Sequence, residues 1–225
     1  PQKMEYLSTE GMKLEGTVNL VVHGEQNEAT VTKVKELLTA ENISFVEADE
    51  VDDSQATILI TTDASHCDDC AAPANADTAV LEEQGYILSA SNDENAKGEI
   101  NIVGADEDGA YYGVMTLTQM MEQGKEDGTF AETVISDYPD VKLRGFVEGF
   151  YGYPWDFEDR LSLMSESSKF KMNTYIYAPK DDPYHKDQWR ELYPDDKAEE
   201  LRQLAEEGKK DNMSFCWSVH PGYGF

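Results

Sequence analysis

The sequence predicts an α/β protein of two parts, an open α/β sheet domain followed by the first three strands of an incomplete (β/α)8 barrel. Three observations support this. Strand and helix patterns alternate along the whole chain of 225 residues. Charge is uneven, with 29 acidic and 6 basic side chains in residues 1–138 but 17 and 12 in residues 139–225. The strands of the second part are continuous apolar runs, which favour a parallel sheet.

Residues 1–138 are predicted to form the N-terminal domain. A buried strand at 18–22 precedes a helix over 28–42, whose apolar positions repeat at helical spacing. Further strands are expected at 43–48, 56–61, 85–89, 99–105 and 130–136, and an Asn/Asp/Gly turn at 92–98 joins two of them. A second helix opens at Asp106–Gly109 and runs to Met121, with acidic residues at its positive N-terminal end. The sequence Asp137-Tyr138-Pro139-Asp140 then ends the pattern.

Residues 139–225 are predicted as the start of the barrel. Strands at 143–150, 173–177 and 214–219 alternate with helices at 156–169 and 196–210. A complete barrel takes about 250 residues, so three strands cannot close one. We therefore expect a truncated barrel whose unpaired strand 214–219 offers an edge for association.

Composition limits the partners. A formal net charge of −28 disfavours nucleic acid and anionic membrane surfaces, and no apolar run approaches the ~20 residues of a membrane span. The acidity also disfavours a polyanionic polysaccharide as the main substrate, although solubility alone can explain it. The chain starts at Pro1 without Met or a signal peptide, which suggests a processed or cloned boundary.

No cofactor is expected, and the roles of the three cysteines stay open. Cys67 and Cys70 lie in an Asp-rich loop, residues 63–76, that we expect to be exposed. A local disulfide, spectator thiols and a metal site with His66 all remain open, but only three ligands are local where zinc takes four. Cys216 lies in an apolar run and is expected in the core.

Candidate functional residues follow the barrel strands. Gly149 and Gly152 stand among aromatic residues in the segment Arg144–Trp155, where backbone can approach a sugar and rings can stack on it. Lys180 follows the second strand, and its ammonium has three donors for hydroxyl groups. His220 follows the third strand, in a loop, where it could line a pocket. Core packing and solvated loops are the alternative interpretation of each cluster.

Asp181 and Asp182 are not expected to be a catalytic pair. Neighbouring side chains of an extended chain point to opposite faces, so both are not expected to face one sugar.

The segments Arg144–Trp155 and Asn173–His185, followed by Trp189-Arg190, resemble the opening of the catalytic domain of glycoside hydrolase family 84. This family contains O-GlcNAcases and bacterial hyaluronidase-like β-N-acetylglucosaminidases. Ahead of it, the segment from Ile100 to Gln119, with Asp106, Gly109 and Gly113, resembles the small α/β domain that precedes hexosaminidase barrels.

The resemblance implies a retaining hydrolysis in which the 2-acetamido oxygen of the substrate attacks C1. One Asp orients the acetamido group and a neighbouring Asp is the general acid and base; both would follow a fourth barrel strand, beyond Phe225. Carried over by position, Gly149 and Lys180 would contact the sugar, and Tyr151 and Asp182 would support them. The resemblance also implies GlcNAc-bearing glycoproteins or glycans as partners, and a secreted or extracellular bacterial protein.

The sequence therefore predicts the N-terminal part of a β-N-acetylglucosaminidase, with no catalytic carboxylate in this chain and no activity of the chain alone. A carbohydrate-binding or scaffolding fragment without turnover and an endo-acting hyaluronidase are the alternatives.

Overall fold

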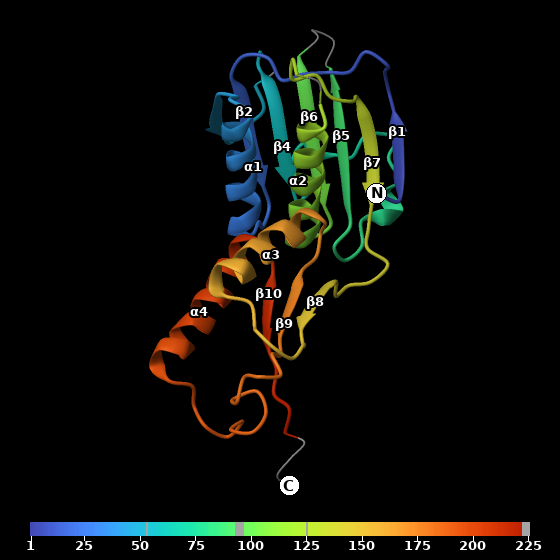
Figure 1. Ribbon diagram of the computed structural model, residues 1–225. Coiled ribbons are helices and arrows are strands. Elements are labelled where there is room, and N and C mark those ends of the chain that lie inside the picture. The colour runs from blue at the N-terminus through green and yellow to red at the C-terminus, as the bar shows by residue number, and fades with distance from the viewer. Residues whose placement is uncertain (53, 93–96, 125, 222–225) are drawn as a thin grey trace. The chain divides into compact units, whose positions relative to one another are not determined.

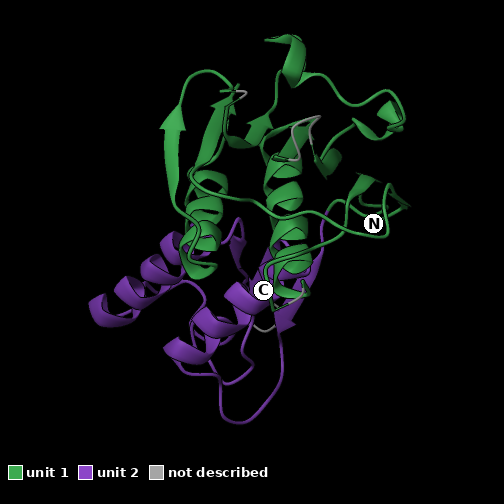
Figure 2. Ribbon diagram, turned by 90° about the horizontal axis from the view of Figure 1, so that it is seen from above, with its two compact units in different colours: residues 1–142 green, residues 143–225 purple. Residues whose placement is uncertain are grey.

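The computed structural model describes residues 1–52, 54–92, 97–124 and 126–221. The chain divides into two compact units, residues 1–142 and residues 143–225 (Figure 2). The expected turn at 92–98 lies largely outside the described residues. Each unit has its own sheet and its own apolar core.

Unit 1 is built on a seven-stranded sheet in the order β1-β7-β5-β6-β4-β2-β3 (Figure 1). Strands β2, β3, β4 and β6 are parallel, and β5, β7 and β1 continue the sheet in antiparallel pairing. The bounds are Lys3–Tyr6 (β1), Val18–His23 (β2), Phe45–Ala48 (β3), Ala56–Thr61 (β4), Tyr86–Asn92 (β5), Gly98–Gly104 (β6) and Thr133–Asp137 (β7). The short edge strand β1 was not predicted, because it has only four residues, all of them exposed, and no apolar run.

Two helices, α1 (Glu28–Ala40) and α2 (Glu107–Glu122), lie side by side on one face of this sheet (Figure 1). Helix α2 begins as the sequence predicts: Asp106 caps it by accepting the Gly109 N–H at 2.8 Å, and its other oxygen accepts the Gln84 N–H at 2.8 Å. A Cβ on Gly109 would lie 2.1 Å from the Gly85 carbonyl oxygen, so only glycine lets the helix start this close to the sheet.

Residues 63–84 run over the other face of the sheet. Most of residues 63–76 are exposed, as the sequence predicts, but the loop is anchored by side chains that pack on the sheet. Cys70 is fully buried against Val21 and Leu59, and Val80 packs on Ile87. The loop must cover this face because β4 in the centre of the sheet is apolar on both sides. Two short 3₁₀ turns, η1 (Asp68–Cys70) and η2 (Thr78–Val80), shape it.

Unit 2 is a parallel β-α-β-α-β arrangement, as predicted. Its elements are β8 (Gly145–Glu148), α3 (Phe157–Lys169), β9 (Thr174–Tyr177), α4 (Asp195–Lys210) and β10 (Ser214–Trp217). The strand order is β10-β9-β8, with both helices packed on aromatic and sulfur-containing side chains of one face. A Cβ on Gly145 would lie 1.7 Å from the Thr174 carbonyl oxygen, so glycine permits the close pairing of β8 with β9.

Two expectations for this unit are wrong. The first strand covers four residues rather than 143–150, and Leu143 is 75% exposed. Cys216 is exposed instead of buried, because it lies on the sheet face that the two helices do not cover.

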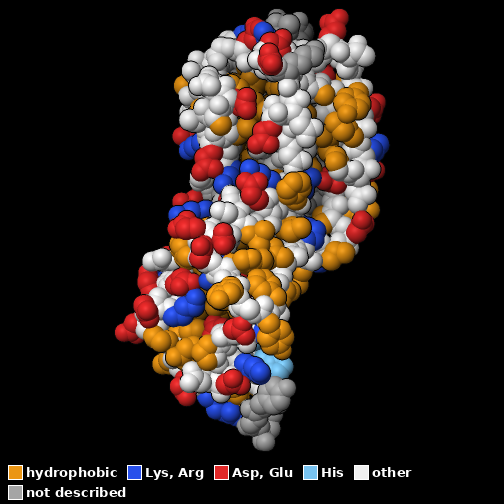
Figure 3. Space-filling view, in the orientation of Figure 1, with side chains coloured by type: hydrophobic (Ala, Val, Ile, Leu, Met, Phe, Trp, Pro, Cys, Tyr) orange, Lys and Arg blue, Asp and Glu red, His pale blue; other side chains and the backbone are white. Residues whose placement is uncertain are grey.

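Acidic side chains are spread over the visible surface with fewer basic ones among them (Figure 3). No helix in the described part of the chain is long and apolar enough to cross a membrane.

Candidate functional site

The loops that follow β8 and β9 lie together at the carboxyl edge of the unit 2 sheet. The Lys180 N–H donates to the Phe150 carbonyl at 3.2 Å, and the Gly152 N–H donates to the Asp181 Oδ2 at 2.6 Å. Gly152 has a φ of 102°, a left-handed conformation that glycine adopts readily. These contacts join the two segments that the sequence analysis selected separately.

The structure therefore brings Gly149, Tyr151 and Lys180 to the same edge. Lys180 is half-buried, and its ammonium makes no hydrogen bond or ion pair with any described residue. Tyr151 is 75% exposed, and Gly149 is half-buried with only Val147 near the position of a Cβ. Carboxyl edges of parallel sheets are the usual place for ligands, and the groups here are open to one.

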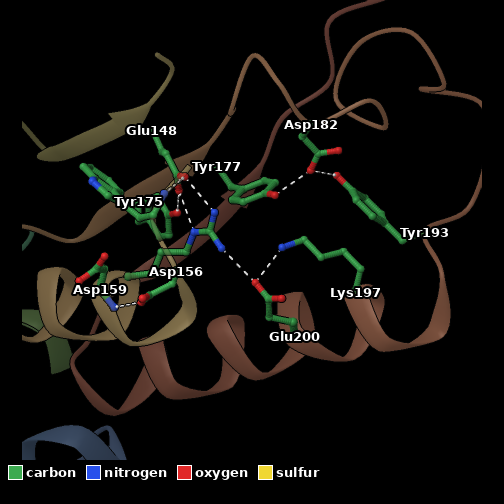
Figure 4. Close-up of polar contacts among 11 residues, drawn as sticks. Glu148, Asp156, Asp159, Tyr175, Tyr177, Asp182, Tyr193, Lys197 and Glu200 are labelled. Atoms are coloured by element: carbon green, nitrogen blue, oxygen red, sulfur yellow. Dashed lines mark hydrogen bonds and ion pairs between the residues drawn. The ribbon is translucent and has the colours of Figure 1, made fainter. Parts of the chain in front are cut away.

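A buried ion pair lies beneath this edge (Figure 4). Glu148, at the end of β8, is fully buried and accepts two hydrogen bonds from the Arg160 guanidinium, both at 2.9 Å. The Tyr175 hydroxyl donates to the same carboxylate, and the Trp155 N–H reaches it at 3.3 Å. Every oxygen of this carboxylate is engaged by protein, so Glu148 holds β8, β9 and α3 together and is not free for proton transfer.

Arg160 extends the pair towards α4. Its Nη1 lies 3.0 Å from Glu200, which also accepts from Lys197 at 2.7 Å, and its guanidinium lies over the Tyr177 ring at 5.1 Å. Burial lowers the pKa of Arg160, but the hydrogen bonds and the charge of Glu148 outweigh it and leave that pKa above its ordinary value. The guanidinium is therefore a permanent cation in the sheet–helix layer.

Asp182 is a second anchor rather than an open carboxylate. Its Oδ2 accepts from the Tyr177 hydroxyl at 2.7 Å and from the Tyr193 hydroxyl at 2.9 Å (Figure 4). Its Oδ1 accepts from the Tyr184 N–H at 2.9 Å. Burial and then the hydrogen bond to Asp182 raise the pKa of Tyr177 far above its usual range. Asp182 thus fixes the loop that carries Lys180.

Asp181 and Asp182 have different partners, but not for the reason that the sequence suggested. Asp181 bonds to the loop after β8, whereas Asp182 bonds to tyrosines. The two residues lie at a turn rather than in extended chain, so strand alternation does not separate them.

The loop after β10 joins the same edge through a buried histidine. His185 is 2% exposed, and its Nδ1 lies 2.9 Å from the Ser218 carbonyl. The His220 N–H donates to the His185 carbonyl at 2.6 Å, and their rings lie 6.3 Å apart. His220 is itself exposed.

A cavity of about 400 Å³ lies beside Asp182. Trp155, Arg160, Tyr177 and Tyr193 contribute to its lining, so it belongs to the side of the sheet that faces the helices. Gly149, Tyr151 and Lys180 are not part of that lining.

The sequence analysis did not find the Glu148–Arg160 pair. A charged residue at the end of an apolar strand was the available signal for Glu148. Its partner lies 12 residues further on, across a loop whose path the sequence does not specify. Among the described residues, the one grouping with metal-ligand spacing is His23, Cys67 and Cys70, which lies in unit 1.

Comparisons with known proteins match the two parts of the chain to different family models. Residues 1–138 match the family described as "Glycosyl hydrolase family 20, domain 2", and residues 144–225 match the family described as "beta-N-acetylglucosaminidase". Protein O-GlcNAcase of Rattus norvegicus and that of Mus musculus are each 44% identical over 80 residues, 36% of this chain and 9% of the relative.

Two solved structures resemble nearly the whole chain. "Structure of CpGH84D" covers 98% of it with a TM-score of 0.86 and 32% identity, and "Structure of CpGH84B" covers 100% with a TM-score of 0.79 and 31% identity. The chain spans 36% and 37% of those proteins. The predicted fold class is confirmed, with a mixed seven-stranded domain followed by parallel β/α units. The chain belongs to the β-N-acetylglucosaminidase family, glycoside hydrolase family 84, and carries an N-terminal domain of the family 20 domain 2 type.

Proposed function

We propose that this chain supplies part of the sugar-binding site of a retaining β-N-acetylglucosaminidase that removes β-linked GlcNAc from glycoproteins or glycans. The observation that carries the proposal is the pair of joined loops at the carboxyl edge of unit 2. There the Lys180 ammonium has no partner among the described residues, while the neighbouring Asp181 and Asp182 carboxylates accept hydrogen bonds from protein groups.

The ammonium of Lys180 suits a sugar hydroxyl. It offers three donors, and a charged donor makes a hydrogen bond worth more than a neutral one. Its backbone is held by the bond to Phe150 and by the turn that Asp182 anchors. The lysine is therefore positioned before a sugar arrives, which reduces the entropy lost on binding.

Gly149 and Tyr151 complete the proposed contacts. Without a side chain, Gly149 lets a hydroxyl reach the backbone, and the exposed ring of Tyr151 offers a face for the apolar side of a sugar. Asp182 is not proposed to touch the sugar; it positions the loop that carries Lys180 through its hydrogen bonds to tyrosines and to the turn. None of these groups is a proton donor suited to the glycosidic oxygen.

The chemical step is proposed to follow the family scheme, with substrate-assisted attack by the acetamido oxygen and a pair of Asp residues from a fourth barrel strand. Those residues would lie in the remainder of the enzyme, since the chain spans little more than a third of the solved homologues. Two relatives are named Protein O-GlcNAcase, which suggests a protein-linked GlcNAc as substrate.

The test is the kinetics of Lys180→Ala in the longer enzyme, with a chromogenic N-acetylglucosaminide as substrate. Losing one charged hydrogen bond should lower kcat/KM roughly 10- to 100-fold. Lys210→Ala is the matched control, because Lys210 is an exposed lysine paired with Glu207 on α4.

The control should leave kcat/KM unchanged, and both variants should melt with the wild type. If Lys180→Ala melts several degrees lower with unchanged kinetics, Lys180 is structural and the proposed site is wrong. Binding without hydrolysis by the wild-type enzyme would instead support a carbohydrate-binding protein.

A further inference from the structure

A second chemical cluster lies in unit 1, at the carboxyl ends of the parallel strands β2 and β4. His23 is the last residue of β2 and pairs in register with Thr61, the last residue of β4. The loop that follows β4 returns Cys67 and Cys70 to the same place. The ligand atoms of His23, Cys67 and Cys70 all lie within 4.8 Å of one another.

His66 supplies a fourth candidate ligand. Its ring centroid lies 4.2 Å from that of His23, and its side chain is exposed, so it can rotate towards the two cysteines. From the sequence only three ligands were local. The fold adds His23, which is 43 residues before His66 in the chain and belongs to a neighbouring strand.

Two thiolates and two imidazoles form a donor set that zinc takes in tetrahedral sites. We propose that His23, His66, Cys67 and Cys70 hold one Zn²⁺ when the two cysteines are reduced. In the structure the two sulfurs are joined by a disulfide, so the site exists in two exclusive states. The disulfide closes it, and the dithiol opens it to metal.

The conversion balances with an external reductant of the phosphine or dithiol class. A phosphine cleaves the S–S bond, water supplies one oxygen and two hydrogens, and the products are a phosphine oxide and two thiols. Zn²⁺ then displaces the two thiol protons as it binds. The sulfurs must separate to about 3.8 Å, the distance between two ligands 2.3 Å from a tetrahedral ion.

The surrounding scaffold is held by contacts other than the S–S bond. The Asn101 Nδ2 donates to the carbonyls of Asp69 at 2.7 Å and Ala71 at 3.2 Å, which fixes the turn η1 between the cysteines. Cys70 is buried against Val21 and Leu59. The Thr62 N–H donates to the His23 carbonyl at 3.3 Å. Opening the disulfide therefore leaves the ligands near one another.

Local charge favours a cation over a free dithiolate. Asp68 and Asp69 lie between the cysteines and are exposed. Their negative charge opposes two unpaired thiolates and attracts Zn²⁺.

The experiment titrates the 225-residue chain with Zn²⁺ against a chromophoric chelator, before and after reduction with a water-soluble phosphine. Co²⁺ is used as a second probe, because thiolate ligation gives a charge-transfer band that carboxylates do not give. The reduced chain should bind one Zn²⁺ and show the Co²⁺ band. The oxidised chain should bind at least about 100-fold more weakly.

Variants locate the site. Cys67→Ser, which leaves the buried Cys70 in place, should roughly halve the Co²⁺ band and weaken Zn²⁺ binding, and His23→Ala and His66→Ala should each weaken Zn²⁺ binding at least about tenfold. Cys216→Ser and His220→Ala are matched controls from unit 2 and should bind like the wild type. Far-ultraviolet circular dichroism checks that each variant is folded.

The proposal is overturned if the reduced chain binds no more Zn²⁺ than the oxidised chain, or if Cys67→Ser binds it as tightly as the wild type. Unchanged binding by His66→Ala would overturn the four-ligand assignment. Loss of binding in Cys216→Ser would move the metal to unit 2.

Discussion

The carboxylate of Glu148 and the guanidinium of Arg160 form a two-pronged ion pair that is sealed inside unit 2, with both hydrogen bonds at 2.9 Å. Arg160 is 2% exposed and Glu148 is fully buried. The pair joins the end of β8 to α3, at the point where the loop after β8 begins. It therefore holds in place the start of the segment that carries Gly149 and Tyr151, the residues proposed to contact the sugar.

Breaking this pair should be costly. Glu148→Gln removes the buried counter-charge of Arg160 and leaves only the partly exposed Glu200, so we expect a loss of about 3–5 kcal/mol in the free energy of unfolding. Denaturant unfolding followed by tryptophan fluorescence measures it, because all three Trp residues lie in unit 2. Glu206→Gln, in an exposed ion pair with Arg202, is the control and should unfold with the wild type. Equal stability of the two variants would contradict the account.

Asp182 and Asp181 should differ when each is replaced by Ala. Asp182→Ala removes the acceptor of the buried Tyr177 hydroxyl, which should cost about 1–3 kcal/mol. Asp181→Ala removes one bond in an exposed turn and should cost less. The measurement is again denaturant unfolding by tryptophan fluorescence. A larger loss from Asp181→Ala would show that the tyrosine contacts are not what anchors the loop.

In an alkaline titration, the 12 tyrosines should ionise in two groups, the exposed ones first and the buried ones at higher pH. Burial, followed by hydrogen bonds or charge from acidic partners, raises the pKa of Tyr86, Tyr175 and Tyr177 above the usual value. A raised tyrosine pKa favours the neutral folded form, so this stability is complete below about pH 10 and is lost as pH rises further.

Near-ultraviolet absorbance of tyrosinate should therefore rise in two steps. The second step, from the buried tyrosines, should coincide with loss of the circular dichroism signal. A single step near pH 10 in the folded protein would contradict the burial of these rings.

Residues 1–142 should fold without unit 2, since their sheet, both helices and their core are complete in themselves. Expressed alone, they should show one cooperative thermal transition. A dye-binding product without a transition would mean that this core depends on the rest of the chain.

The sequence was sufficient to predict the elements that short-range patterns determine, such as helix caps, apolar repeats and apolar runs. The helix α2 was found from Asp106 and the apolar repeat after it, and the parallel strands of unit 2 from their apolar runs. Lys180 was placed correctly just after the second strand of unit 2, but the turn at Asp181 and Asp182 was treated as extended chain. Lys180 and Gly149 were selected with help from the family resemblance, and their roles remain predictions.

Features that depend on contacts distant in sequence could not be predicted. Glu148 contacts Arg160 because of the path of the intervening loop. His23 lies near Cys67 because β2 and β4 are neighbouring strands. The burial of Cys70 follows from the apolar outer face of β4, which needs a cover. Cys216 was expected in the core, yet it lies on the sheet face that the two helices leave uncovered.

The central claim is that this chain binds the sugar but does not supply the catalytic carboxylates. Hydrolysis of a chromogenic N-acetylglucosaminide by the purified 225-residue chain, beside the longer enzyme, tests it most directly. The account predicts turnover by the longer enzyme and none by the chain, because acid–base assistance alone contributes about 10²–10⁴-fold. Turnover by the chain that Asp181→Asn or Asp182→Asn abolishes would contradict it and place the catalytic groups in the loop after β9.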